Sequence, residues 1–127
     1  MLASWQTELE IASFNTISRD PYQKDYDAIV DVWVKERTAR FALEYERTLK
    51  SLKQYDRIRI ALEAEQQIEL VLYLTSGMEV LVHLLHEFQS VRKKVAFANA
   101  RSFEQQLLDT VVTGRDGTAI KFQDLLQ

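Results

Sequence analysis

The sequence predicts an all-α fold: a helical bundle of three to five helices with long antiparallel members. Three observations favour it. The 127 residues include only three Gly and one Pro, whereas an all-β domain needs many short turns. Apolar residues recur at spacings of three and four along much of the chain, as they do on one face of a helix. Two segments also carry the capping-box pattern that begins many helices.

The first expected helix covers residues 2–18. Apolar residues share one of its faces: Leu2, Trp5, Leu9 and Ala12. We expect the next helix to begin at Asp20-Pro21, because Asp is a favourable N-cap and Pro suits the first helical position.

Residues 21–75 contain no further Gly or Pro and no Asn. A single helix over this range would be about 80 Å long, whereas a compact domain of this size has a radius of gyration of about 14 Å. The apolar stripe also changes its phase near Lys53–Arg57, which indicates an interruption there. Whether residues 21–75 form one helix or two stays open, but a fold-back into antiparallel, coiled-coil-like neighbours is expected.

The capping-box pattern Ser76-Gly-Met-Glu79 predicts the start of the next helix. Its apolar seam alternates steps of three and four without a gap: Leu81, Leu84, Phe88, Val91, Val95 and Ala98. A second pattern, Ser102-Phe-Glu-Gln105, predicts a short helix that reaches Val112 or continues the previous one.

The C-terminal residues differ in composition from the rest. We expect a helical domain over residues 1–112 and a Gly-containing hairpin or docking tail over 113–127. In the hairpin, Asp116-Gly117 would turn the chain between arms at Val111–Thr113 and Ala119–Phe122. The alternative is a Gly-rich loop followed by a docked tail.

Composition excludes several classes of protein. The absence of Cys removes disulfides, thiolate metal sites and thiol nucleophiles. A net charge of −3 lacks the basic excess of a dedicated nucleic-acid binder. No secretory signal is expected at the N-terminus, and the longest apolar run, Leu70–Leu74, is far shorter than the roughly 20 residues of a membrane span. We therefore expect a cytoplasmic protein with no membrane association.

Candidate catalytic groups are sparse when placed on helices. His83 and His86 are the only histidines, and with Glu79 they do not give the spacing of a di-iron bundle. A group of acidic residues suggests the Mg²⁺ site of an all-α nucleotide phosphohydrolase: Glu63, Glu65 and Glu69, with Glu79 and Glu87. Such a site needs a paired acidic motif on another helix, and the sequence has none. We expect no catalytic, cofactor or metal residues, no small-molecule substrate and no enzyme activity.

A protein–protein interaction module is the leading function: a small subunit, adaptor or assembly factor that self-associates or binds a protein partner. Large aromatic side chains, which are favoured at interface centres, crowd the first half of the chain. Valines on all sides of Trp33 would surround a helix with apolar surface. The candidate interface is Tyr22, Tyr26, Val30, Trp33, Val34 and Phe41.

Two alternatives remain beside the interaction module. A basic patch of Arg92, Lys93, Lys94 and Arg101 would suit a nucleic-acid-associated accessory protein, although the aromatic interleaving of a base-stacking surface is absent. The metal-dependent phosphohydrolase is third. Acid-before-base pairs four residues apart, such as Glu46–Lys50, instead indicate a solvated helix face.

Overall fold

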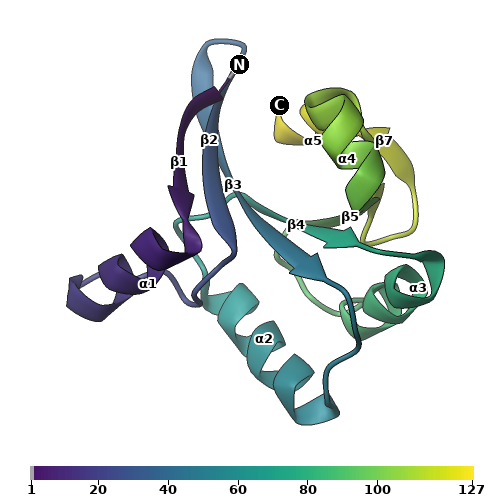
Figure 1. Ribbon diagram of the computed structural model, residues 1–127, viewed down its shortest axis with the longest axis horizontal. Coiled ribbons are helices and arrows are strands. Elements are labelled where there is room, and N and C mark those ends of the chain that lie inside the picture. The colour runs from purple at the N-terminus through teal and green to yellow at the C-terminus, as the bar shows by residue number, and fades with distance from the viewer. Residues whose placement is uncertain (1) are drawn as a thin grey trace.

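The structure is a computed structural model that describes residues 2–127, and it shows a seven-stranded mixed sheet with helices on both faces (Figure 1). The predictions of an all-α fold, a helical bundle and a coiled coil are therefore wrong. In chain order the elements are β1 (Leu2–Thr7), α1 (Glu8–Ile17), β2 (Ala28–Val34), β3 (Arg37–Glu46), α2 (Leu52–Ala64), β4 (Leu70–Thr75), α3 (Met78–Glu87), β5 (Val95–Asn99), α4 (Ala100–Gln106), η1 (Leu107–Asp109), β6 (Val111–Gly114), β7 (Ala119–Lys121) and α5 (Phe122–Leu126).

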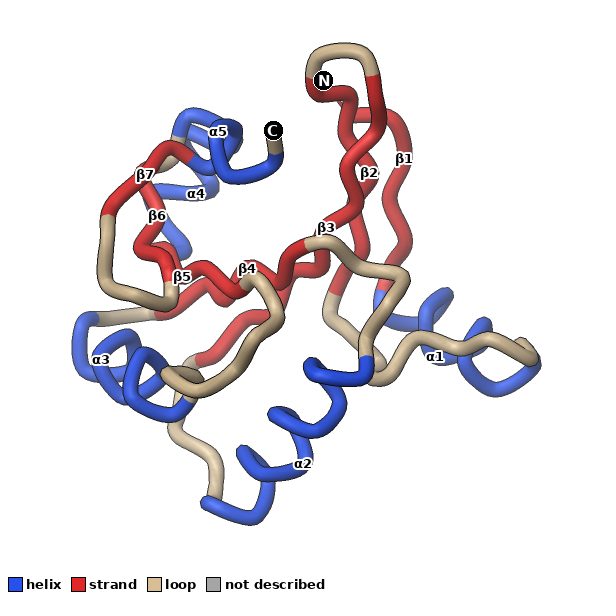
Figure 2. The backbone as a smooth tube through the Cα atoms, turned by 180° about the vertical axis from the view of Figure 1, so that it is seen from behind, coloured by secondary structure: helices blue, strands red, loops and turns tan. Residues whose placement is uncertain are grey.

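The strands lie in the sheet in the same order as in the sequence. β1, β2 and β3 are antiparallel, β3, β4 and β5 are parallel, and β5, β6 and β7 are antiparallel again. Helices α2 and α3 make the two crossovers that parallel neighbours require. Figure 2 shows the strands as one curved surface from β1 to β7.

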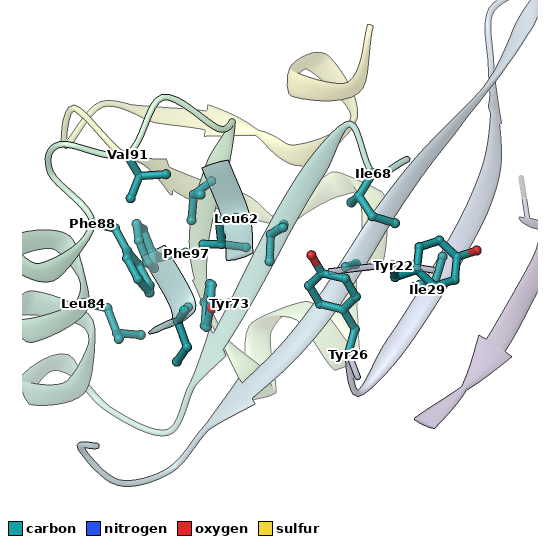
Figure 3. Packing of buried hydrophobic residues seen from close by; sticks show 14 of the residues in the cluster. Tyr22, Tyr26, Ile29, Leu62, Ile68, Tyr73, Leu84, Phe88, Val91 and Phe97 are labelled. Atoms are coloured by element: carbon teal, nitrogen blue, oxygen red, sulfur yellow. The ribbon is translucent and has the colours of Figure 1, made fainter. Parts of the chain in front are cut away.

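Each face of the sheet has its own hydrophobic core. Residues of α1, α2 and α3 pack on one face with Tyr73 and Phe97 (Figure 3), while α4, η1 and α5 cover part of the other face. Alternate residues of a strand supply the two cores: in β2, Ile29 belongs to the first and Val32 to the second. Because of this alternation, one sheet supplies side chains to both hydrophobic cores.

The apolar residues around Trp33 belong to a strand and not to a helix. Val32 and Val34 are buried on one face of β2, whereas Trp33 projects from the other face and is exposed. β-branched Val favours this extended backbone. The scarcity of Gly and Pro does not oppose this fold, because helices make the parallel connections. Residues Lys35 and Glu36 form the tight turn between β2 and β3, with Lys35 in the left-handed region at φ 54°.

The second half of residues 21–75 also differs from the expectation. Helix α2 begins at Leu52, where the Ser51 hydroxyl accepts the Gln54 amide N–H and the Gln54 side chain accepts the Ser51 N–H. The expected interruption at Lys53–Arg57 is therefore the first turns of a helix. Leu70–Leu74, the longest apolar run, is a central strand buried between parallel neighbours.

The expected seam helix is only half present. Helix α3 begins at Met78 after Gly77, without a side-chain cap from Ser76, and ends at Glu87. Leu84 and Phe88 are fully buried, as a seam requires, but Val95 and Ala98 lie in β5.

The C-terminal hairpin is present as β6 and β7, which pair from Val111 with Lys121 to Thr113 with Ala119. The expected boundary at residue 112 lies within β6. Across residues 2–127, no helix combines the length and apolar character that crossing a bilayer requires.

Candidate functional site

Two carboxylates lie beside each other where β2 begins and β3 approaches its end. Ala28 pairs with Leu43, so the preceding Asp27 lies beside Glu44. Asp27 is held there because its Oδ2 accepts the amide N–H of Tyr45 at 2.8 Å. Like charges on directly opposed positions destabilise a sheet, so this pair costs stability.

A lysine ammonium lies against the same pair. Lys24 Nζ donates to Glu44 Oε1 at 2.8 Å. Burial raises the pKa of Glu44 to about 7; Lys24 lowers this pKa in part, and the nearby Asp27 raises it. Glu44, which is 9% exposed, therefore exchanges its proton near neutral pH.

A third carboxylate lies two residues further along β3 on the same face. Glu46 is 3% exposed and forms an ion pair with the Lys50 ammonium. Its Oε2, however, has no hydrogen-bond partner within residues 2–127, and neither has the hydroxyl of Tyr73, which is 2% exposed. We call Asp27, Glu44 and Glu46, with Lys24 and Lys50, the carboxylate cluster.

Tyr73 lies at the floor of this cluster. It pairs with Glu44 across β3 and β4, so both side chains project from the same face of the sheet. Burial raises the pKa of the Tyr73 hydroxyl well above its ordinary range, and the charges of Glu44 and Glu46 raise it further. Unpaired buried polar atoms cost about 1–3 kcal/mol each. The Tyr73 hydroxyl and Glu46 Oε2 therefore lower the stability of the folded protein.

Two further tyrosines support the cluster from behind. The Tyr55 hydroxyl accepts the Lys50 amide N–H at 3.1 Å and fixes the backbone that carries the lysine. The Tyr26 hydroxyl donates to Glu65 Oε1 at 2.9 Å, which anchors the residue before Asp27. Burial, followed by the charge of Glu65, raises the pKa of Tyr26. Both tyrosines thus remain neutral hydrogen-bonding groups.

A polar hollow of about 240 Å³ opens at the same edge of the sheet. Residues near the C-terminal ends of β3, β4 and β5 contribute to it. Its lining contains no carboxylate: Tyr45, Thr75, Ser76, Asn99, Ala100 and Arg101. The Arg47 guanidinium lies 5.1 Å from the centre of the Tyr45 ring. The carboxyl ends of parallel strands are the usual binding edge of an open α/β sheet.

The arrangement suits some cations better than others. Among residues 2–127, no group of three or more His, Asp or Glu side chains is placed to enclose a metal ion. That is unfavourable for Zn²⁺ held by protein ligands alone. Mg²⁺, in contrast, is commonly bound by one or two carboxylates together with water and substrate phosphate oxygens, and Asp27 and Glu44 supply such a pair.

The six residues of the candidate interface do not form one surface. Tyr22 and Tyr26 are buried in the core under α1 and α2, whereas Val34 and Phe41 are buried on the opposite face of the sheet. Trp33 is exposed, and Val30 is half-buried at the edge of an apolar groove. An interface through Trp33 stays a prediction.

The basic patch is divided between the two ends of β5. Arg92 and Lys94 precede the strand and Arg101 follows it, so about 16 Å of strand separates them. Lys93 is directed elsewhere and donates to the Glu65 carbonyl at 2.9 Å.

The expected acidic and histidine groups are also dispersed. Glu65 accepts from Tyr26 and from the backbone, and Glu87 pairs with Arg59. His83 lies against the Tyr55 ring and is 3.6 Å from Glu87, while His86 is exposed.

Sequence reasoning missed Asp27, Glu44 and Glu46. The signal was the alternation Glu44-Tyr45-Glu46 after the apolar residues Phe41-Ala42-Leu43, which places both acids on one face of a strand. If residues 46–50 formed a helix, Glu46 and Lys50 would be an exposed ion pair on its surface. They do pair, but across the end of a strand and with the carboxylate buried.

Comparisons with known proteins add no relative: no protein-family model, curated protein or solved structure matches this chain.

Proposed function

We propose that the protein hydrolyses a phosphate ester with the help of a divalent cation, and that Asp27 and Glu44 hold this cation. The observation that carries the proposal is the pair itself: two carboxylates side by side on neighbouring strands. Behind them lie two buried polar atoms without a hydrogen-bond partner in residues 2–127, Glu46 Oε2 and the Tyr73 hydroxyl. Such an arrangement opposes folding, and polar groups kept at a cost to stability are typical of functional sites.

Charge favours a phosphate ester as the substrate class. Lys24 and Lys50 place two ammonium groups at the cluster. Arg101 lines the hollow at the same edge of the sheet, and Arg47 lies against the ring of Tyr45, another residue of its lining. Phosphate oxygens would complete the coordination of a cation that has only two protein carboxylates. The hollow offers hydroxyl, amide and guanidinium donors to the rest of the substrate.

Hydrolysis would follow from these groups. Asp27 and Glu44 would hold the cation, which would supply an activated water and positive charge for the phosphoryl oxygens. Water adds to phosphorus, the bond from phosphorus to the leaving oxygen breaks, and a proton is transferred to that oxygen. Lys24, whose ammonium donates to Glu44, would neutralise a phosphate bound beside this carboxylate. This proposal competes with the expectation of a non-enzymatic protein, which stays a prediction.

Calorimetric titration with Mn²⁺, followed by an assay of bis(p-nitrophenyl) phosphate hydrolysis, tests the proposal. We expect one Mn²⁺ per chain, with Asp27→Asn and Glu44→Gln each weakening binding more than tenfold and removing Mn²⁺-dependent hydrolysis. Glu104→Gln, which changes an exposed carboxylate on α4, is the matched control and should leave both unchanged. A wild-type chain that binds no Mn²⁺ and hydrolyses no ester would refute the proposal.

The interaction module is a second candidate, favoured by a different observation. An apolar groove of about 510 Å³ runs between β1–β3 and the α4–η1 segment, with Leu2, Val30 and Phe103 in its lining. Leu107 at its rim is exposed and has a positive φ of 49°, an uncommon conformation for Leu that is often found at functional sites.

Light scattering at tens of micromolar, with a pull-down, examines this second candidate. Self-association that Trp33→Ala or Leu107→Glu reduces, without a change in melting, would support it. A monomer whose pull-downs recover no protein would count against it.

A further inference from the structure

A cationic pocket of about 360 Å³ lies at the opposite edge of the sheet from the carboxylate cluster. It forms where β5 begins and where the β6–β7 hairpin turns, and Arg92, Lys94 and Arg115 supply its positive charge. Glu46 ends β3, whereas Lys94 precedes β5, and these strands run in the same direction. The pocket is therefore separate from the proposed hydrolytic site.

We propose that this pocket binds the phosphate group of a nucleotide, either free or within a polynucleotide. Three cations from two segments of the chain converge on it, and none of them forms an ion pair with a carboxylate anywhere in residues 2–127. Lys94 Nζ is oriented by a bond of 2.9 Å to the Leu125 carbonyl and keeps two further donors. Arg side chains suit the geometry of phosphate oxygens.

The pocket also has an apolar wall. Val95, Ile120 and Leu125 contribute to its lining, and its volume lies within the roughly 300–1,000 Å³ of small-molecule sites. A phosphate ester that carries a flat, weakly polar group fits this combination better than inorganic phosphate does. A nucleotide base supplies such a group.

One acidic side chain, Asp116, lies in the lining and opposes an anion there. Its Oδ1 accepts the Thr118 amide N–H at 3.0 Å and the Thr118 hydroxyl at 2.7 Å, so its charge is directed into its own turn. The Thr118 hydroxyl bond, followed by the amide bond, lowers the pKa of Asp116, which stays ionised. If phosphate enters the pocket, Asp116→Asn should strengthen binding severalfold, since Asn keeps the accepting oxygen and removes the charge.

Calorimetry with adenosine 5′-monophosphate, a 12-nucleotide single-stranded DNA and inorganic phosphate tests the proposal on the intact chain. We expect Arg92→Gln and Arg115→Gln each to weaken binding of the nucleotide-containing probe at least tenfold. Arg57→Gln, an exposed arginine on α2, should change it less than twofold. Circular dichroism melting verifies that each variant folds. If Arg115→Gln does not fold, Arg92→Gln still tests the proposal, because Arg92 is exposed.

The probes distinguish the two sources of phosphate. Binding of the monophosphate identifies a free nucleotide; binding of the DNA alone, with affinity that falls steeply as salt rises, identifies a polynucleotide. Binding of neither probe at millimolar concentration, or equal binding by wild type and both arginine variants, overturns the proposal. Arg92 and Arg115 lie at the opposite edge of the sheet, so we expect their variants to leave Mn²⁺ binding at Asp27 and Glu44 unchanged. Failure here and failure of the hydrolase proposal are therefore distinguishable.

Discussion

Glu44 illustrates a side chain whose role conflicts with stability. Its carboxyl is buried beside Asp27, and its pKa in the folded protein, about 7, exceeds the roughly 4.3 of a solvated Glu. The folded state therefore binds its proton more tightly than the unfolded state does. Stability from this group is complete below about pH 4 and is lost as the pH rises to about 7.

We accordingly expect Glu44→Gln to stabilise the protein above pH 7, by at most about 4 kcal/mol at 1.36 kcal/mol per pKa unit. The gain should disappear at pH 4, where the wild-type side chain is also neutral. Urea unfolding at pH 4, 6 and 8 measures this difference. A variant that is less stable than the wild type at pH 8 would show that the Lys24 ion pair outweighs burial.

The turn between β2 and β3 contains a residue with a strained backbone. Lys35 has a φ of 54°, where a side chain costs about 1 kcal/mol and Gly costs almost none. Lys35→Gly should raise the free energy of unfolding by about 0.5–1 kcal/mol. Glu36→Gly, one residue later and without a positive φ, should lower it. Thermal unfolding of the two variants in parallel measures both effects. Equal destabilisation by both would show that the backbone at Lys35 is not strained.

Local signals predicted some elements and misplaced others. The Asp116-Gly117 turn indicated the hairpin as one of two alternatives, and the structure has the hairpin, whose pairing needs only near neighbours. In contrast, apolar residues at Tyr22, Tyr26, Ile29 and Trp33 fit helical spacing by coincidence: two precede β2, and the other two lie on β2. The Ser51–Gln54 capping box marks the start of α2, but it lies where the sequence predicts an interruption of a helix, at Lys53–Arg57.

The site was harder to predict than the elements. Asp27 and Glu44 are 17 positions apart, and only the register of β2 with β3 joins them. Lys24 and Tyr73 reach the cluster from a loop and from a third strand. A sequence read as helices places these residues on unrelated surfaces, so the cluster becomes visible only once the sheet is known.

At the scale of the whole molecule, stability depends on a layer of aromatic side chains beneath the carboxylate cluster. Phe88 contacts Tyr55, Tyr73 and Phe97, with ring centres 5.1–6.2 Å apart, and it is fully buried (Figure 3). Phe88→Ala should cost about 3–5 kcal/mol, a large part of a typical domain stability of about 5–15 kcal/mol.

Chemical denaturation followed by circular dichroism measures that loss. Because this layer supports Tyr73, Mn²⁺ binding should weaken together with stability in Phe88→Ala. Val82→Ala, an exposed position on α3, which Phe88 directly follows, is the matched control and should change neither. A Phe88→Ala chain that melts like the wild type would contradict the placement of α3 on the sheet.

The order of the strands has a kinetic consequence. Each strand pairs only with its neighbours in the sequence, and no pairing joins residues more than 30 positions apart, the separation of Leu2 and Val32. Short loops close at low entropic cost, and chains with local contacts fold faster than chains with distant ones. The sheet can therefore grow strand by strand from its N-terminal edge while the ribosome is still adding residues, so that Asp27 and Glu44 meet before the cationic pocket has been synthesised.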